Sequence, residues 1–92
     1  MQIIYNPTFR KHFNNIWDYI ASDSQYSADR FRQQLQSKIE SIPHFPYKFR
    51  KSFYYDNENI RDYIFKGYTI PYFVNMEKNQ IIILDIFKWV DK

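Results

Sequence analysis

Two runs of apolar residues at helical spacing, separated by a short polar stretch, constrain the fold of this 92-residue chain more than any other feature. In the first run the apolar residues are 4, 3, 1 and 3 positions apart and fall on one helical face: Phe9, Phe13, Ile16, Trp17 and Ile20. In the second run the spacings are 3, 4, 4 and 3: Ala28, Phe31, Leu35, Ile39 and Ile42. Neither apolar face can stay in water, so both helices need a third surface to pack on.

Polar residues and a proline predict where these helices begin and end. Thr8 is expected to cap the first helix, which should end near Ser22, and Asp23-Ser24 is expected to cap the second. Pro43 stops the second helix, because the residue before a proline avoids helical backbone angles. The loop between the two helices is short, so together they form a helical hairpin.

The rest of the chain predicts strands that supply the third surface. An apolar run at residues 2–5, closed by Asn6-Pro7, indicates a first strand, and three more runs cover residues 61–66, 68–74 and 80–89. Gly67 and a polar turn at residues 75–79 separate these three runs, which is typical of an antiparallel meander. Pro71 should lie at a bulge or point to an edge, and the apolar residues 80–87 should form the central strand. We therefore expect one α+β domain over residues 1–92, with a mainly antiparallel twisted sheet.

Composition excludes several classes of protein. Hydrophobic residues make up 45% and aromatic residues 22%, with one glycine and four prolines, which excludes disordered and fibrous chains. The chain has no cysteine, which excludes disulfide scaffolds, thiol catalysis and cysteine-bearing metal sites. No apolar stretch typical of a signal peptide follows the N-terminus, and the longest apolar run, residues 81–84, is too short to span a membrane. We expect a cytoplasmic protein with no membrane partner.

Few residues indicate a catalytic or metal site. His12 and His44 have no second metal ligand at a useful spacing, and one glycine cannot build a phosphate-binding loop. No serine lies in a G-x-S-x-G elbow. Asp62 can pair with a base on the sheet, and Asp85, in a strand that looks buried, needs a partner there. We expect Asp85 to form a structural salt bridge rather than to act in catalysis. Because no metal ligands and no phosphate-binding loop are found, we expect no metal and no cofactor.

Basic residues of the sheet half offer a better candidate site. The chain carries a net charge of +3, and six bases interleave with aromatic residues in this half: Lys48, Arg50, Lys51, Arg61, Lys66 and Lys88, with Tyr54, Tyr55, Tyr63, Tyr68, Tyr72 and Trp89. Bases neutralise phosphates, and aromatic faces stack on unpaired nucleotide bases. A solvated sheet edge above an aromatic core would give the same pattern.

Several stretches, in this order, resemble the RelE/ParE toxin superfamily. Ile16-Trp17-Asp18-Tyr19-Ile20-Ala21 and then Ser27-Ala28-Asp29-Arg30-Phe31 resemble its helical hairpin, residues 59–72 look like its second and third strands, and residues 81–87 look like its fourth. The resemblance covers nearly the whole chain. It implies a bacterial toxin encoded beside an antitoxin that neutralises it by direct binding, with two helices packed on a mainly antiparallel sheet.

The superfamily has two branches, and the resemblance is closer to the ParE-like one. Ribonuclease members, which cut messenger RNA on the ribosome, usually carry an arginine where this chain has Thr69 after Tyr68. They also usually end with a histidine or basic residue close to a tyrosine, whereas this chain ends Phe87-Lys88-Trp89 and onward without a histidine or tyrosine. The resemblance therefore favours a non-enzymatic toxin that poisons DNA gyrase.

For both branches, the sequence leaves open which residues bind the target or take part in catalysis. As a gyrase toxin, the chain has these candidates for target binding: Arg50, Arg61, Lys66, Tyr72, Lys88 and Trp89. As a ribonuclease, it would stabilise the phosphoryl transition state with Lys48, Arg50, Lys51, Arg61 and Lys88, but no residue clearly activates the ribose hydroxyl. A third alternative is a purely interacting or degenerate domain. The antitoxin should bind near exposed aromatics of the helical hairpin and the sheet edge, and the free toxin should self-associate through exposed apolar patches.

Overall fold

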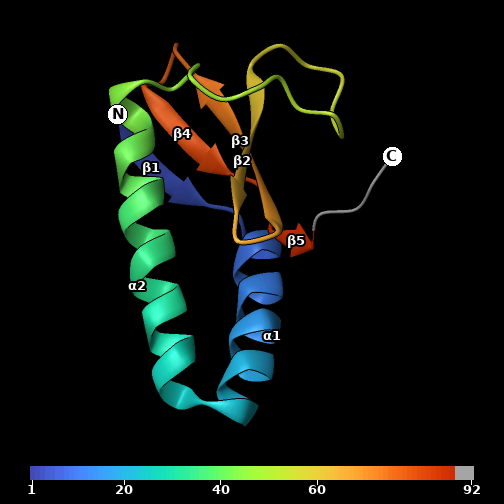
Figure 1. Cartoon of the computed structure of the whole chain (residues 1–92). Coiled ribbons are helices and arrows are strands. Elements are labelled where there is room, and N and C mark those ends of the chain that lie inside the picture. The colour runs from blue at the N-terminus through green and yellow to red at the C-terminus, as the bar shows by residue number, and fades with distance from the viewer. Residues whose placement is uncertain (89–92) are drawn as a thin grey trace.

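A strand, two long helices and a meander of strands follow one another along the chain (Figure 1). The computed structural model describes residues 1–88. Its elements are β1 (Gln2–Tyr5), α1 (Pro7–Asp23), α2 (Gln25–Ser41), the short 3₁₀-helix η1 (Ile42–His44), β2 (Ile60–Phe65), β3 (Tyr68–Asn75), β4 (Gln80–Ile83) and β5 (Phe87–Lys88). This order confirms the predicted α+β architecture, in which a helical hairpin precedes most of the sheet.

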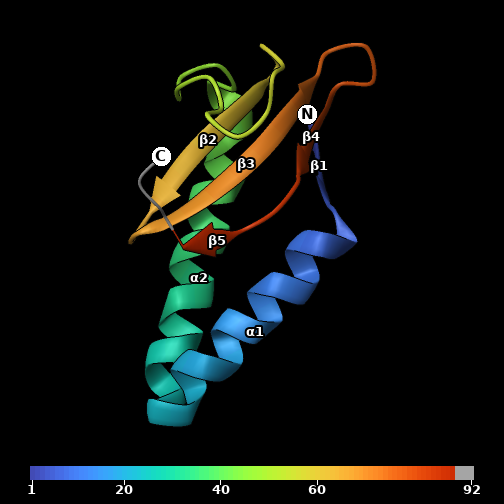
Figure 2. The same cartoon turned by 90° about the vertical axis from the view of Figure 1, so that its right-hand side faces the viewer.

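The sheet has the strand order β1-β4-β3-β2, and β5 pairs with β3. β1 runs parallel to β4, whereas β3 is antiparallel to β2, β4 and β5. β4 therefore lies inside the sheet, as predicted, and its four residues pair on both sides. The parallel pair therefore places the N-terminal strand β1 beside β4. The hairpin of α1 and α2 projects well beyond the sheet (Figures 1 and 2).

The continuous strand expected at residues 80–89 is wrong, because the chain breaks between β4 and β5. Tyr72 pairs with Ile83 and Thr69 pairs with Phe87, so two residues of β3 face three residues of the other strand. One extra residue in a strand is a β-bulge. Pro71 lies opposite this bulge and accepts a hydrogen bond at its carbonyl from the Leu84 amide, 2.9 Å away. The proline thus stands where the ladder is already interrupted, as predicted, and its missing N–H costs little. Trp89 lies outside the described residues.

Helix ends follow the predicted signals with one correction. Asn6, and not Thr8, caps α1: its side-chain oxygen accepts the Thr8 amide at 2.8 Å, and Pro7 occupies the first helical position. Ser24 serves both helices, because its amide donates to the Ile20 carbonyl and its hydroxyl accepts the Ser27 amide at 3.1 Å. α2 ends at Ser41, and Pro43 lies within η1.

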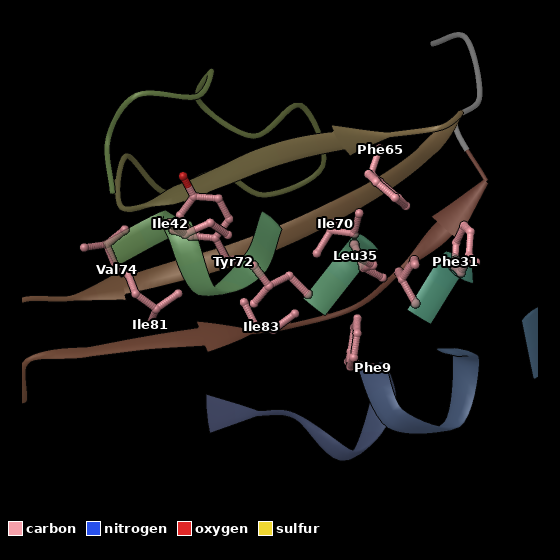
Figure 3. Close-up of a cluster of buried hydrophobic side chains, with 12 residues drawn as sticks. Phe9, Phe31, Leu35, Ile42, Phe65, Ile70, Tyr72, Val74, Ile81 and Ile83 are labelled. Atoms are coloured by element: carbon pink, nitrogen blue, oxygen red, sulfur yellow. The ribbon is translucent and has the colours of Figure 1, made fainter. Parts of the chain in front are cut away.

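The core lies between one sheet face and the hairpin, as the close-up in Figure 3 shows. β3 contributes Ile70, Tyr72 and Val74, and β4 contributes Ile81 and Ile83, because alternate residues of a strand point to the same face. All five apolar residues of the second run are buried: Ala28, Phe31, Leu35, Ile39 and Ile42. In the first run only Phe9 is buried, and Phe13, Ile16 and Ile20 are partly buried against the core. The far end of α1 extends past the sheet, so no strand within residues 1–88 covers it (Figure 2).

No helix in the described part of the chain is both long enough and apolar enough to cross a membrane.

Candidate functional site

The six basic residues of the sheet half lie in two groups at opposite ends of β2 and β3. Lys51 pairs with Arg61 in an isolated bridge at the start of β2, while Lys66 is in the β2–β3 turn and Lys88 pairs with Tyr68. Arg61 pairs with Tyr72, four residues along β3 from Tyr68. Four residues of strand span about 13 Å, so the six bases do not converge on one site. Figure 2 shows β5 beside the β2–β3 turn, and at the other end of these strands it shows the long loop of residues 45–59 that precedes β2.

Arg61 fastens the long loop before β2. Its guanidinium donates from Nη1 to the Phe49 carbonyl at 3.1 Å and from Nε to the Glu58 carbonyl at 3.2 Å. It also lies over the ring of Tyr47, with 4.9 Å from Cζ to the ring centroid. Tyr47 in turn donates its hydroxyl to the Asn59 side chain at 2.8 Å. These contacts place both ends of the loop around one cation, so Arg61 has a structural role here.

Arg50 and Asp62 hold the same loop against the outer edge of β2. The Asp62 side chain is fully buried, and its Oδ2 lies 3.5 Å from Nη2 of Arg50, whose side chain is 33% exposed. That oxygen also accepts the Phe53 amide at 3.0 Å, and the Asp62 amide donates to the Arg50 carbonyl. Arg50 stacks on the ring of Phe53, 3.9 Å from Cζ to the centroid. Asp62 thus pairs with a base, as expected, but Arg50 lies in the loop and not on the sheet.

Tyr72 is a core residue, which corrects its place among the target-binding candidates. Its side chain is 0% exposed, and its hydroxyl donates to the Pro46 carbonyl at 2.6 Å. Burial raises the pKa of Tyr72 well above its usual value, with a smaller opposing effect of Arg61. A partner cannot reach this ring in the folded chain, so Tyr72 acts by holding the loop to the sheet. The sequence could not predict this burial, because an aromatic residue can lie either on the surface or in the core.

The lysines are the accessible members of the basic set. Lys48, Lys51, Lys66 and Lys88 are all exposed. Lys48 lies over the Phe49 ring at 5.6 Å, and Lys66 donates to the Gln34 side chain on α2, which ties the β2–β3 turn to the hairpin. Trp89, the remaining target-binding candidate, lies outside the described residues.

A hydrogen bond between His12 and Asp85 joins α1 to the bulge. Nδ1 of His12 lies 2.6 Å from Oδ1 of Asp85, and the side chains are 42% and 19% exposed. The same oxygen accepts the Ile86 amide at 2.7 Å. Asp85 thus has the partner that the sequence required, although spacing could not identify His12 as that partner. Within residues 1–88, no three His, Asp or Glu side chains come close enough together to hold a metal ion.

A groove lies between α1 and α2, and the sequence patterns did not predict which residues line it. It has a volume of about 350 Å³, and its apolar lining comes from β1 and both helices: Tyr5, Phe9, Phe13, Leu35 and Ile39. Arg10, Asn14, Arg32 and Gln36 supply its polar lining. The two helical runs include four of these apolar residues, Phe9, Phe13, Leu35 and Ile39, but they do not indicate the polar ones. Arg10 stands next to Phe9 and Arg32 next to Phe31 in the sequence, and only the packing of the two helices shows that both reach one groove.

Comparisons with known proteins give one family match and a match in fold. A family model described as the ParE toxin of the type II toxin–antitoxin system parDE matches residues 3–88. A solved structure from P. aeruginosa, described as a chromosomal ParDE toxin–antitoxin system, superposes with a TM-score of 0.79. The alignment covers 98% of this chain and 97% of that one at 16% identity, so it supports the fold. The sequence matches none of the curated proteins with which it was compared.

Proposed function

Because the chain belongs to the ParE toxin family of type II toxin–antitoxin systems, we propose that it stops growth by binding DNA gyrase. The observation that carries this proposal is the match of the ParE family model to nearly the whole chain, residues 3–88. A cognate antitoxin is the partner that such a system supplies. Gyrase acts on cytoplasmic DNA, so the proposal includes a cytoplasmic location and no catalytic step by the toxin itself.

The position of Thr69 supports the gyrase target over the ribosome. Ribonuclease relatives usually carry an arginine here, whereas Thr69 is 0% exposed within β3. No cation from this position therefore faces an RNA phosphate. The two arginines of the ribonuclease alternative, Arg50 and Arg61, are engaged with backbone carbonyls and a buried carboxylate of their own chain.

The proposed gyrase contact lies at the exposed end of the β2–β3 hairpin and β5. Lys66 and Lys88 are exposed there and carry two positive charges, and Trp89 follows Lys88 directly in the sequence. Arg50 and Arg61 support the long loop at the other end of these strands, which we assign to a second part of the contact. Exposed charges of this kind mainly set association rate and orientation.

A brief induction in bacteria lacking the antitoxin tests the target. Incorporation of labelled thymidine and leucine is followed over the first minutes, and we expect thymidine incorporation to fall first because replication needs gyrase. Purified protein should likewise inhibit supercoiling of relaxed plasmid by gyrase. If leucine incorporation falls first, and purified protein cuts messenger RNA on ribosomes while supercoiling is untouched, the chain is a ribonuclease instead. Harmless expression of the folded protein would indicate a purely interacting domain.

A matched pair of variants tests the contact surface. Lys66→Ala with Lys88→Ala should weaken inhibition of gyrase by about tenfold, the scale of removing interface charges. Lys11→Ala with Lys38→Ala removes the same charge from exposed positions on α1 and α2 and should leave inhibition unchanged. Equal inhibition by both pairs would remove the hairpin end from the proposed contact. Thermal unfolding of each variant checks that the fold is intact.

A further inference from the structure

The long loop of residues 45–59 carries a group of aromatic side chains that face the solvent. Within residues 1–88, eight large hydrophobic side chains are exposed, and four of them belong to this loop: Phe45, Tyr47, Phe53 and Tyr55. Phe45 is 72% exposed and Phe53 is 61% exposed. Single apolar residues scattered over a surface are ordinary, but a group of exposed rings marks a binding surface.

Two hollows in this loop each combine aromatic rings with a lysine. The first is lined by residues 44–48 and has a volume of about 630 Å³. The second is lined by residues 51–56 and has a volume of about 520 Å³. Their rings and lysines are Phe45, Tyr47 and Lys48 in the first hollow, and Phe53, Tyr54, Tyr55 and Lys51 in the second. Both volumes fall in the range of small-ligand sites, so each hollow can take one flat ring.

Two arginines fix rings of these hollows in place. Arg61 lies over Tyr47 of the first hollow, 4.9 Å from Cζ to the ring centroid, and Arg50 lies over Phe53 of the second at 3.9 Å. Both guanidinium groups are anchored in turn, Arg61 by loop carbonyls and Arg50 by the buried carboxylate of Asp62. A ring that is already held loses little conformational entropy when a ligand stacks on it.

The charge that remains for a ligand lies on Lys48 and Lys51. Both lysines are exposed, and neither forms an ion pair with any residue from 1 to 88. Two exposed acids limit the positive region, since Asp56 lines the second hollow and Glu58 follows it in the loop. The positive charge is therefore concentrated at two lysines three positions apart. An ammonium group is a point charge that binds phosphate well.

Aromatic rings beside lysines match the chemistry of an unpaired nucleic acid strand, whose bases stack on the rings while its phosphates meet the charges. A duplex hides the faces of its bases, so these rings favour a single strand. We propose that the loop binds an unpaired stretch of DNA, with one base in each hollow and phosphates at Lys48 and Lys51. The choice of DNA over RNA rests on the proposed function, because gyrase acts on DNA. The proposal adds a direct contact with nucleic acid to the contact with gyrase.

The salt dependence of binding tests the two lysines. The probe is a fluorescent oligothymidylate of about 12 nucleotides, within the usual size of such sites, and the purified chain is titrated into it. Each neutralised phosphate of a single strand adds about −0.7 to the slope of log K against log salt, so two lysines should give about −1.4. Lys48→Ala with Lys51→Ala should bring the slope close to zero. Lys11→Ala with Lys38→Ala removes the same charge from the helices and should keep it.

Removal of exposed rings tests the hollows. Phe45→Ala with Phe53→Ala should raise Kd at least about 25-fold, the smallest loss expected for two stacked bases. Tyr19→Ala with Tyr26→Ala is the matched control, since it removes two exposed rings from the hairpin and should change Kd within about twofold. Phe45→Ala alone keeps the contact of Arg50 with Phe53 and should still raise Kd about fivefold. This single variant decides the matter if the double variant disturbs the loop.

Several outcomes would overturn the inference: no binding at low salt, tighter binding of duplex DNA or of an oligouridylate of the same length, or equal losses in the loop variants and their controls. Supercoiling assays with gyrase separate the inference from the proposed function. Inhibition of gyrase by a chain that binds no oligothymidylate would overturn the inference alone. Binding of oligothymidylate by a chain that leaves gyrase active would count against the proposed function alone.

Discussion

At the scale of single residues, burial decides what a polar side chain does in this protein. Tyr72 and Arg61 both belong to the aromatic and basic set that suggests target binding, yet both turn toward the long loop before β2. Tyr72 donates to the Pro46 carbonyl, and Arg61 donates to the carbonyls of Phe49 and Glu58. A loop without regular structure needs such donors, because its carbonyl groups have no ladder partners.

Tyr72→Phe should lower the free energy of unfolding by about 1–2 kcal/mol, since the partly buried Pro46 carbonyl loses its donor. The raised pKa of Tyr72 adds a dependence on pH. The folded state keeps the phenol protonated above its unfolded value of 10.0, so stability should fall as pH rises past that value. Urea unfolding between pH 7 and 11 measures both effects. The pH dependence should be weaker in Tyr72→Phe, and an equal slope in both proteins would contradict this assignment.

At the scale of elements, the β2–β3 hairpin depends on a turn of two residues. Lys66 and Gly67 both have positive φ angles, 48° and 83°, and lie between the paired residues Phe65 and Tyr68. Two positive φ angles in a two-residue loop define the turn whose twist matches that of the flanking strands. The single glycine of the chain is therefore used at the position where a side chain is most strained.

Gly67→Ala should destabilise the protein by about 1 kcal/mol through the backbone alone. A Cβ at this position meets no atom within 4 Å, so no steric clash contributes. Gly67→Asn is the control, because asparagine tolerates positive φ better and should cost less than alanine. Thermal unfolding of the three proteins gives the comparison. Equal stability of Gly67→Ala and the unsubstituted chain would show that the hairpin adopts another turn.

At the scale of the whole molecule, one aromatic chain connects the hairpin to the sheet. From β1 it passes through α1 and α2 to β2 and β3: Tyr5, Phe9, Phe13, Phe31, and then Phe65 and Tyr68, with every successive pair of ring centroids within 6.2 Å. Phe31 is the link between the two layers, since it contacts Phe13 on one side and both sheet residues on the other. Neither layer keeps its core when the other unfolds.

We therefore expect a single cooperative unfolding transition, as for one domain over residues 1–92. Far-UV circular dichroism reports mainly on the helices, and near-UV circular dichroism reports on aromatic packing across both layers. The two midpoints in urea should coincide. Separate midpoints would show that the projecting end of the hairpin, around Trp17, unfolds independently of the sheet.

Much of the architecture was predictable because it depends on local patterns. Helical spacing identified both helices and their buried faces, and the turn residues identified the strands, since side-chain period and turn chemistry act over a few residues. Pro71 even indicated the bulge, because a residue without an N–H needs a gap in the ladder. The exact cap at Asn6 and the break between β4 and β5 were missed, since either neighbour could supply a cap and an apolar run does not reveal a one-residue insertion.

The sequence by itself determined the fold class, the family resemblance and the need of Asp85 for a partner. Only the tertiary structure decided that the partner is His12, that Tyr72 is buried, that the bases lie in two groups, and that Arg10 and Arg32 share one groove. These facts depend on contacts between residues far apart in the chain, because the packing of helices, sheet and loop brings such residues together. Spacing along the chain does not determine that packing.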